Sequence, residues 1–152
     1  MNNFSEPCFT PPTFDGAGSK HRYFIEVSYK GTAYAGFQIQ QNANTIQAEV
    51  EKALRILLTP GEGVGVRLTG SSRTDAGVHA LQNFFHFDLE NPKSEVDWKK
   101  IIYSLNAILP HDIVAIRILA VEPNAHCRFD AISRTYKSVS YTHLTLPTKR
   151  IV

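Results

Sequence analysis

The 152-residue sequence has little cysteine, no long apolar run and no strong excess of either charge. Its two cysteines, Cys8 and Cys127, stand far apart, so we expect a reducing compartment and no disulfide framework. No segment approaches the roughly 18 consecutive apolar residues that a membrane span requires. The N-terminal segment also lacks the basic and apolar regions of a signal peptide. We therefore predict a cytoplasmic protein with no membrane contact.

The net charge of +2 is too small to identify a nucleic-acid partner, because such proteins carry their charge as a local patch. Apolar residues make up 43% of the chain and charged residues 20%, which is ordinary for a globular domain with a real core. Residues 1–20 contain Asn, Ser, Pro and Gly without periodicity, and we predict a disordered extension there. One folded domain is expected over residues 21–138.

Apolar periodicity predicts four strands and two helices in this domain. The expected strands cover residues 22–29, 66–70, 82–89 and 112–122, and the expected helices cover residues 45–58 and 96–109. Asn44 followed by Gln47 has the spacing of a helical capping box. The order strand, helix, strand, strand, helix, strand is that of the ferredoxin-like fold. This is an α+β arrangement in which two helices cover one face of an antiparallel sheet.

The last part of the sequence changes character after a fifth predicted strand, which would begin over residues 131–138. Residues 139–152 resemble one reading frame of a transposase adapter used in shotgun DNA sequencing. We therefore predict that the native sequence ends near Ser138, that residues 139–152 are a non-native tail, and that a C-terminal half is missing. The alternative is an ordinary C-terminal strand with a basic end.

One predicted loop, residues 70–80, combines small residues with an acid and a base. It lies between two predicted strands and places Asp75 two positions from Arg73. A carboxylate on a loop held by rigid strands suits a catalytic acid. The alternative is a plain turn, because Asp and Gly are common turn formers. On the chemistry of the loop alone, the plain turn is favoured.

Four stretches of the sequence, taken together, favour a catalytic loop over a plain turn. They are residues 29–38 (YKGTAYAGFQ), 45–49 (TIQAE), 72–80 (SRTDAGVHA) and 126–137 (HCRFDAISRTYK). In this order they resemble the motifs of the bacterial tRNA pseudouridine synthase A family, and the resemblance covers about residues 23–137. The family usually has Asp where Lys30 stands and often His where Ala35 stands, but the loop with Asp75 shows no departure.

The resemblance implies an isomerase that converts uridine to pseudouridine at positions 38–40 of the tRNA anticodon stem-loop, without a cofactor or metal. Asp75 would be the nucleophile, and it would attack either uracil C6 or ribose C1′. Tyr136 would stack on the base. Arg73 would either fill the gap left by the flipped base or pair with Asp75 and keep it ionised. Arg128 would contact phosphate, with Arg134 as a further candidate.

Other charged groups and the histidines carry weaker expectations. Lys30 is a weaker phosphate candidate, and for each basic residue the alternative is a solvated surface charge. His79 is expected to brace the loop rather than to move protons. We predict no metal site, because no ligand spacing is present among His21, His86, His111 and His126.

The family's members are about twice as long as the native part and usually pair as homodimers, so tRNA and a second copy are the expected partners. The resemblance implies a second half that closes the cleft, and we predict that this chain alone is inactive. A non-catalytic ferredoxin-like RNA-binding module is the alternative function. A structural domain without an RNA role is a third.

Overall fold

The computed structural model describes residues 20–59, 65–90, 92 and 96–138. The predictions for residues 1–19 and 139–152 lie outside this part of the chain. The regular elements are β1 (Lys20–Tyr29), the 3-10 helix η1 (Gly31–Ala33), α1 (Ile46–Leu58), β2 (Thr69–Gly70), β3 (Ala80–Glu90), α2 (Trp98–Ile108) and β4 (Ile113–Val121). No helix among the described residues has the length and apolar character needed to cross a membrane.

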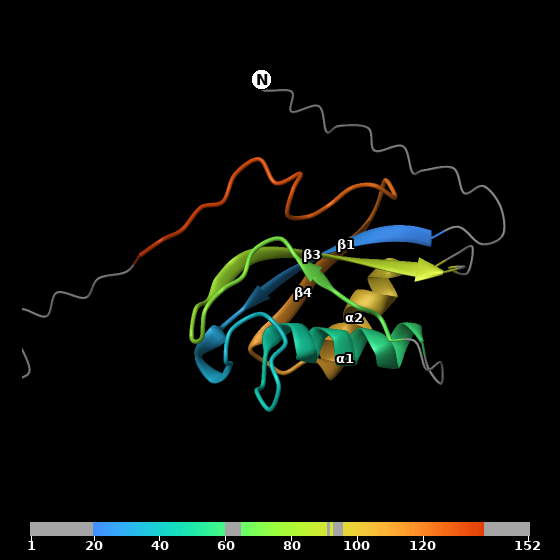
Figure 1. Cartoon of the computed structure of the whole chain (residues 1–152). Helices are drawn as coiled ribbons and strands as arrows, with labels where there is room; N and C mark the ends of the chain where they lie inside the picture. Colours follow the sequence, from blue (N-terminus) through green and yellow to red (C-terminus); the bar gives the residue numbers. More distant parts are fainter. Residues whose placement is uncertain (1–19, 60–64, 91, 93–95, 139–152) are drawn as a thin grey trace, which may run out of the picture.

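The strands form one antiparallel sheet in the order β2-β3-β1-β4. β1 is central and pairs with β3 on one side and β4 on the other, whereas β2 meets β3 only through Thr69 and Gly70. Figure 1 shows α1 and α2 on the same face of this sheet. The predicted α+β, ferredoxin-like arrangement is confirmed.

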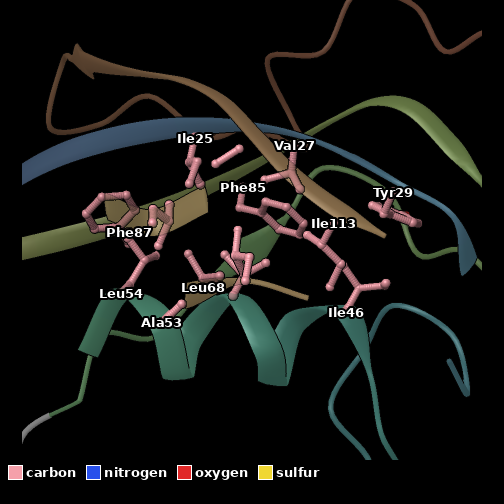
Figure 2. Packing of buried hydrophobic residues seen from close by; sticks show 14 of the residues in the cluster. Ile25, Val27, Tyr29, Ile46, Ala53, Leu54, Leu68, Phe85, Phe87 and Ile113 are labelled. Carbon is pink, nitrogen blue, oxygen red and sulfur yellow. The ribbon is translucent and has the colours of Figure 1, made fainter. Parts of the chain in front are cut away.

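The core lies between the helices and the sheet, and Figure 2 shows its packing. Alternate residues of β1 are buried, as expected of a strand with one covered face. These residues are Tyr23, Ile25, Val27 and Tyr29. On β3, Phe85 and Phe87 are 0% and 1% exposed, so both rings belong to the core.

The cap of α1 and the length of β2 differ from the predictions. Thr45, not Asn44, caps α1, and its side-chain oxygen accepts the N–H of Ala48 at 3.4 Å. The Gln47 side chain is not in a capping box and donates instead to the carbonyl of Leu68 at 2.8 Å. The second strand is shorter than predicted, because the Leu68 N–H donates to the Glu51 carboxylate of α1 at 2.8 Å.

The predicted fifth strand is wrong. Residues 131–138 have no regular secondary structure, and Ile132 is fully exposed. Instead of pairing with a sheet edge, this segment is held through Arg134, whose guanidinium donates to the carbonyls of Ser71 and Arg128. Figure 1 shows the chain after β4 (orange) crossing the side of the sheet opposite the helices. The candidate active site therefore lies on the side of the sheet opposite the helices.

Candidate active site

The loop that carries Asp75 runs from Ser71 to His79, between β2 and β3. Gly77 has φ +79°, in the left-handed region that favours glycine, and the Val78 N–H donates to the Asp75 carbonyl at 3.2 Å. The backbone at Asp75 is thus a turn, as one alternative expected. The Asp75 carboxylate is exposed, and within the described part of the chain it takes part in no ion pair or side-chain hydrogen bond.

Residues 31–37 hold this loop from one side, and Figure 1 shows the loop (green) beside η1 (blue). The bonds are Phe37 N–H to Thr74 O (3.0 Å), Gly77 N–H to Tyr34 O (3.3 Å) and Gly31 N–H to His79 Nδ1 (2.9 Å). His79 therefore braces the loop, in agreement with the prediction. Tyr34 is itself fixed, because its hydroxyl donates to the Asp112 carboxylate at 2.5 Å. Burial, followed by that hydrogen bond, raises the pKa of Tyr34.

Two glycines in this supporting segment allow close backbone contact with the loop. A Cβ on Gly31 would lie 2.0 Å from the carbonyl oxygen of Val78. Gly36 has φ +93°, and its Cβ would lie 2.9 Å from the carbonyl oxygen of Thr74. Side chains larger than hydrogen at these positions would displace the loop. The two glycines therefore help to fix where Asp75 stands.

A buried hydrogen-bond network lies beneath the loop. Asn83 of β3 is 3% exposed, and its Oδ1 accepts the hydroxyls of Ser71 at 2.8 Å and Ser72 at 3.2 Å. Its Nδ2 donates to the Tyr29 hydroxyl oxygen at 3.1 Å, and this hydroxyl lies 2.8 Å from Thr74 Oγ1. Sequence reasoning missed this network. The one sequence signal for this network was the polar side chain of Asn83 inside a strand rich in phenylalanine.

An open hollow of about 530 Å³ lies beside the loop. It is lined by Ser71, Ser72, Arg73, Arg128, Phe129, Ala131, Arg134 and Tyr136. The structure thus brings together Arg73, Arg128 and Tyr136, three of the four predicted site residues, and the further candidate Arg134. Asp75 is not among the lining residues.

The hollow is positively charged, since its lining includes three guanidinium groups and no carboxylate. Arg134 is held by its two carbonyl partners, Ser71 O at 3.0 Å and Arg128 O at 2.8 Å. Within the described residues no ion pair joins Arg73 to Asp75, so one of its two expected roles is not observed. The other role, filling the gap left by a flipped base, stays a prediction. Tyr136 is 75% exposed, so much of its ring is accessible for stacking.

A second group of side chains fixes the start of the segment that carries Arg128 and Tyr136. His86 Nδ1 and Cys127 Sγ lie 3.2 Å apart, and the Cys127 thiol donates to the Thr69 carbonyl at 3.1 Å. Burial raises the pKa of Cys127 to about 11 and lowers the pKa of His86 to about 4, so both groups are neutral at pH 7. The His126 ring meets His86 edge-on, with centroids 4.5 Å apart.

His86, His126 and Cys127 present possible ligand atoms within 4.8 Å of one another, which the sequence spacing did not reveal because β3 and the turn after β4 supply them. The neutral thiol already has an acceptor in Thr69, and His126 Nδ1 accepts the Arg128 N–H at 3.2 Å. These hydrogen bonds anchor the segment that carries Arg128 and Tyr136, here called the binding segment, to the sheet.

Comparison with protein families matches residues 25–130 to the family model described as tRNA pseudouridine synthase. Curated relatives with the name tRNA pseudouridine synthase A are also similar. The relative from Parabacteroides distasonis is 47% identical over 117 residues, which cover 76% of this chain and 44% of the relative. The relative from Bacteroides fragilis is 46% identical over 119 residues, with 78% and 45% covered. The relative from Staphylococcus aureus is 39% identical over 120 residues, with 79% and 42% covered. This chain spans a little under half the length of the curated relatives it matches.

Proposed function

This chain belongs to the tRNA pseudouridine synthase family, and from that premise we propose that it supplies the catalytic loop of an isomerase that converts uridine to pseudouridine in tRNA. The observation that carries the proposal is the Asp75 loop. It presents an exposed carboxylate, is supported on two sides, and adjoins a positively charged hollow. We propose the anticodon stem-loop, at positions 38–40, as the place of modification.

Asp75 is the proposed nucleophile. Its carboxylate adds to uracil C6 or ribose C1′, the bond from C1′ to N1 breaks, and the uracil turns. A bond from C1′ to C5 then forms and the bond to Asp75 breaks. C5 loses its proton and N1 gains one, so the product is an isomer of the substrate. Among the described residues this carboxylate has no ion-pair partner, so no such pair has to break before it attacks. Tyr136 stacks on the detached base and assists removal of the C5 proton. A stacking ring allows the base to rotate, because stacking is tolerant of orientation in its plane.

The arginines of the hollow are proposed to bind the substrate. A paired uridine must leave the stem before it can meet Asp75, at a cost of roughly a few kcal/mol. Arg73 fills the space that the base vacates, and Arg128 contacts a backbone phosphate. Arg134, which already donates to two carbonyls, holds the binding segment against the loop.

The remaining parts of the proposal concern the whole protein. We propose a cytoplasmic enzyme that acts as a homodimer, in which residues 21–138 form the N-terminal half of the catalytic domain. A second half completes the cleft, so the 152-residue chain alone is expected to be inactive. The adapter-like sequence of residues 139–152 supports a non-native tail.

A chimera tests the catalytic proposal. Residues 20–138 of this chain replace the matching segment of the Parabacteroides distasonis relative, to which the chain is 47% identical over 117 residues. The chimera is expected to release tritium from C5-labelled uridine in a tRNA transcript. The Asp75→Asn chimera is expected to release none while its tRNA dissociation constant stays within about threefold, because the exchanged group is exposed and isosteric.

One observation favours a rival, a non-catalytic RNA-binding module: the hollow is basic, and Asp75 does not line it. The same assay separates the two functions. A folded chimera that binds tRNA and never releases label contradicts the enzyme. Release that persists in Asp75→Asn shows that another group is the nucleophile.

A further inference from the structure

We propose that Asn83 is a positioning residue that sets the placement of the Asp75 carboxylate relative to the arginine-lined hollow. The inference rests on the proposed function, because it concerns how the catalytic loop is held, and it assigns Asn83 no contact with substrate. Asn83 is almost fully buried in β3, beneath the loop. Its Oδ1 bonds to the start of the loop, and its Nδ2 bonds to the Tyr29 hydroxyl, which lies beside Thr74 of the loop.

The first arm of the network leads to the hollow. Ser71 and Ser72 line the hollow, and both hydroxyls donate to Asn83 Oδ1. The Phe84 N–H donates to the same oxygen at 3.0 Å. The backbone N–H of Phe84 can only donate, so a flipped amide would bring its NH₂ group against this donor, and the orientation of the Asn83 amide is thereby fixed. One wall of the hollow is thereby attached to β3.

The second arm leads to Asp75. Asn83 Nδ2 donates to the Tyr29 hydroxyl oxygen, so the Tyr29 proton is available for Thr74 Oγ1, 2.8 Å away. Tyr29 is 4% exposed, so its hydroxyl has little access to water as a replacement partner. Thr74 directly precedes Asp75, and its carbonyl also accepts the Phe37 N–H. The arm therefore fixes the residue next to the proposed nucleophile.

Asn83 joins these two arms, so losing its side chain releases both Ser71–Ser72 and Thr74 from their attachment to β3 while leaving every proposed substrate contact in place. A misplacement of about 1 Å in a reacting group can lower a rate by about 100-fold. We expect the Asn83→Ala variant to lower the rate of the chemical step by that order, with little change in tRNA affinity. Tyr29→Phe, which keeps the ring and removes only the hydroxyl, is expected to break the second arm alone.

The first test measures amide hydrogen exchange in the 152-residue chain, without any activity. The Gly77 and Phe37 N–H groups, which bond to Tyr34 and Thr74, report on the loop. They are expected to exchange about tenfold faster in Asn83→Ala and in Tyr29→Phe, the effect of losing roughly one hydrogen bond. If Asn83→Ala does not fold, Tyr29→Phe decides the test.

Asn106→Ala is the matched control. Asn106 also uses both ends of its amide, but it bonds to the backbone of Ala115 in β4, at 2.9 and 2.8 Å, away from the loop. This variant is expected to speed exchange at the Ala115 amide and to leave the loop amides unchanged. Loop amides that exchange equally in the Asn83→Ala and Asn106→Ala variants would overturn the proposal.

The second test uses the chimera and separates chemistry from binding. Asn83→Ala is expected to lower the single-turnover rate about 100-fold and to change the tRNA dissociation constant less than about threefold. Adding Tyr29→Phe is expected to cost little more, because both changes break one connected network. Asn106→Ala is expected to leave the rate and the affinity unchanged. An unchanged rate in the Asn83→Ala chimera overturns the positioning role. If the parent chimera is inactive, the proposed function fails, and the exchange experiment still decides how the loop is held.

Discussion

Replacing Gly31 with alanine tests how closely the 31–37 segment supports the Asp75 loop. The added Cβ would lie 2.0 Å from the carbonyl oxygen of Val78, whereas ordinary contact begins at 3.4 Å. The two backbones must therefore separate by about 1.4 Å, the difference of these two distances. Neither atom belongs to a flexible side chain, so the strain cannot be relieved by a rotamer change.

The expected loss of stability follows from two contributions. Forcing atoms into a packed contact costs about 1–3 kcal/mol. The Gly31 N–H bond to His79 lies in the same contact, and losing it adds about 1 kcal/mol. The free energy of unfolding should thus fall by about 2–4 kcal/mol. The displaced Val78 is close to Asp75 in sequence, so tritium release by the Gly31→Ala chimera should also fall, by the order of 100-fold.

The assay is urea unfolding of the 152-residue chain, followed by the fluorescence of its single tryptophan, Trp98. Trp98 packs against Tyr23 with ring centroids 4.6 Å apart, so its emission reports on the core. Gly65→Ala is the control, because the three atoms nearest to its Cβ would all belong to the flexible Arg55 side chain, the closest at 3.1 Å. The free energy of unfolding of this variant should change by less than about 0.5 kcal/mol. Equal stability of the Gly31→Ala and Gly65→Ala variants would refute the reasoning.

Three further predictions concern ionisable groups of the site. Asp75→Asn should change the free energy of unfolding by less than about 0.5 kcal/mol in the same assay, because the exposed carboxylate makes no side-chain bond among the described residues. Burial lowers the pKa of His86 from 6.5 to about 4. As the pH drops, the unfolded chain therefore binds the proton before the folded chain does. The free energy of unfolding should fall by up to roughly 3 kcal/mol between pH 6.5 and pH 4. His86→Gln should remove most of this slope in pH-dependent urea titrations, and an equal slope in both proteins would show that another group titrates. In the chimera, Arg128→Ala should reduce the slope of log tRNA affinity against log salt concentration by about one. Filter binding measures this slope, and an unchanged slope would show that Arg128 does not contact a phosphate.

The order of the elements could be predicted because it depends on local pattern. Tyr23, Ile25 and Val27 alternate along one strand, and this alternation alone places them on one face. The cap of α1 could not be predicted, because Asn44 and Thr45 are both good capping residues. The choice depends on the preceding loop, where the Ile46 N–H donates to the carbonyl of Gly36. The fifth strand failed for a similar reason, since a strand needs a partner that local sequence does not reveal.

Only those parts of the candidate site that belong to recognisable sequence motifs could be predicted. The loop with Asp75 and the segment with Arg128 were found through resemblance to known motifs. The groups that support them come from distant parts of the chain and have no motif of their own. Asn83 and Tyr29 are 54 positions apart, and His86 and Cys127 are 41 positions apart. Such pairs meet only once the sheet has formed.

The supports of the Asp75 loop lie on opposite sides of it, and this has a consequence for how variants will behave. Residues 31–37 hold its backbone, whereas Asn83 holds its side chains from below. Arg134 then links the binding segment to Ser71, a residue that Asn83 also fixes. The hollow and the loop with Asp75 are thus both attached to β3 through Asn83. Changes inside β3 should therefore alter the rate of chemistry, while changes on the outer rim of the hollow should alter tRNA affinity.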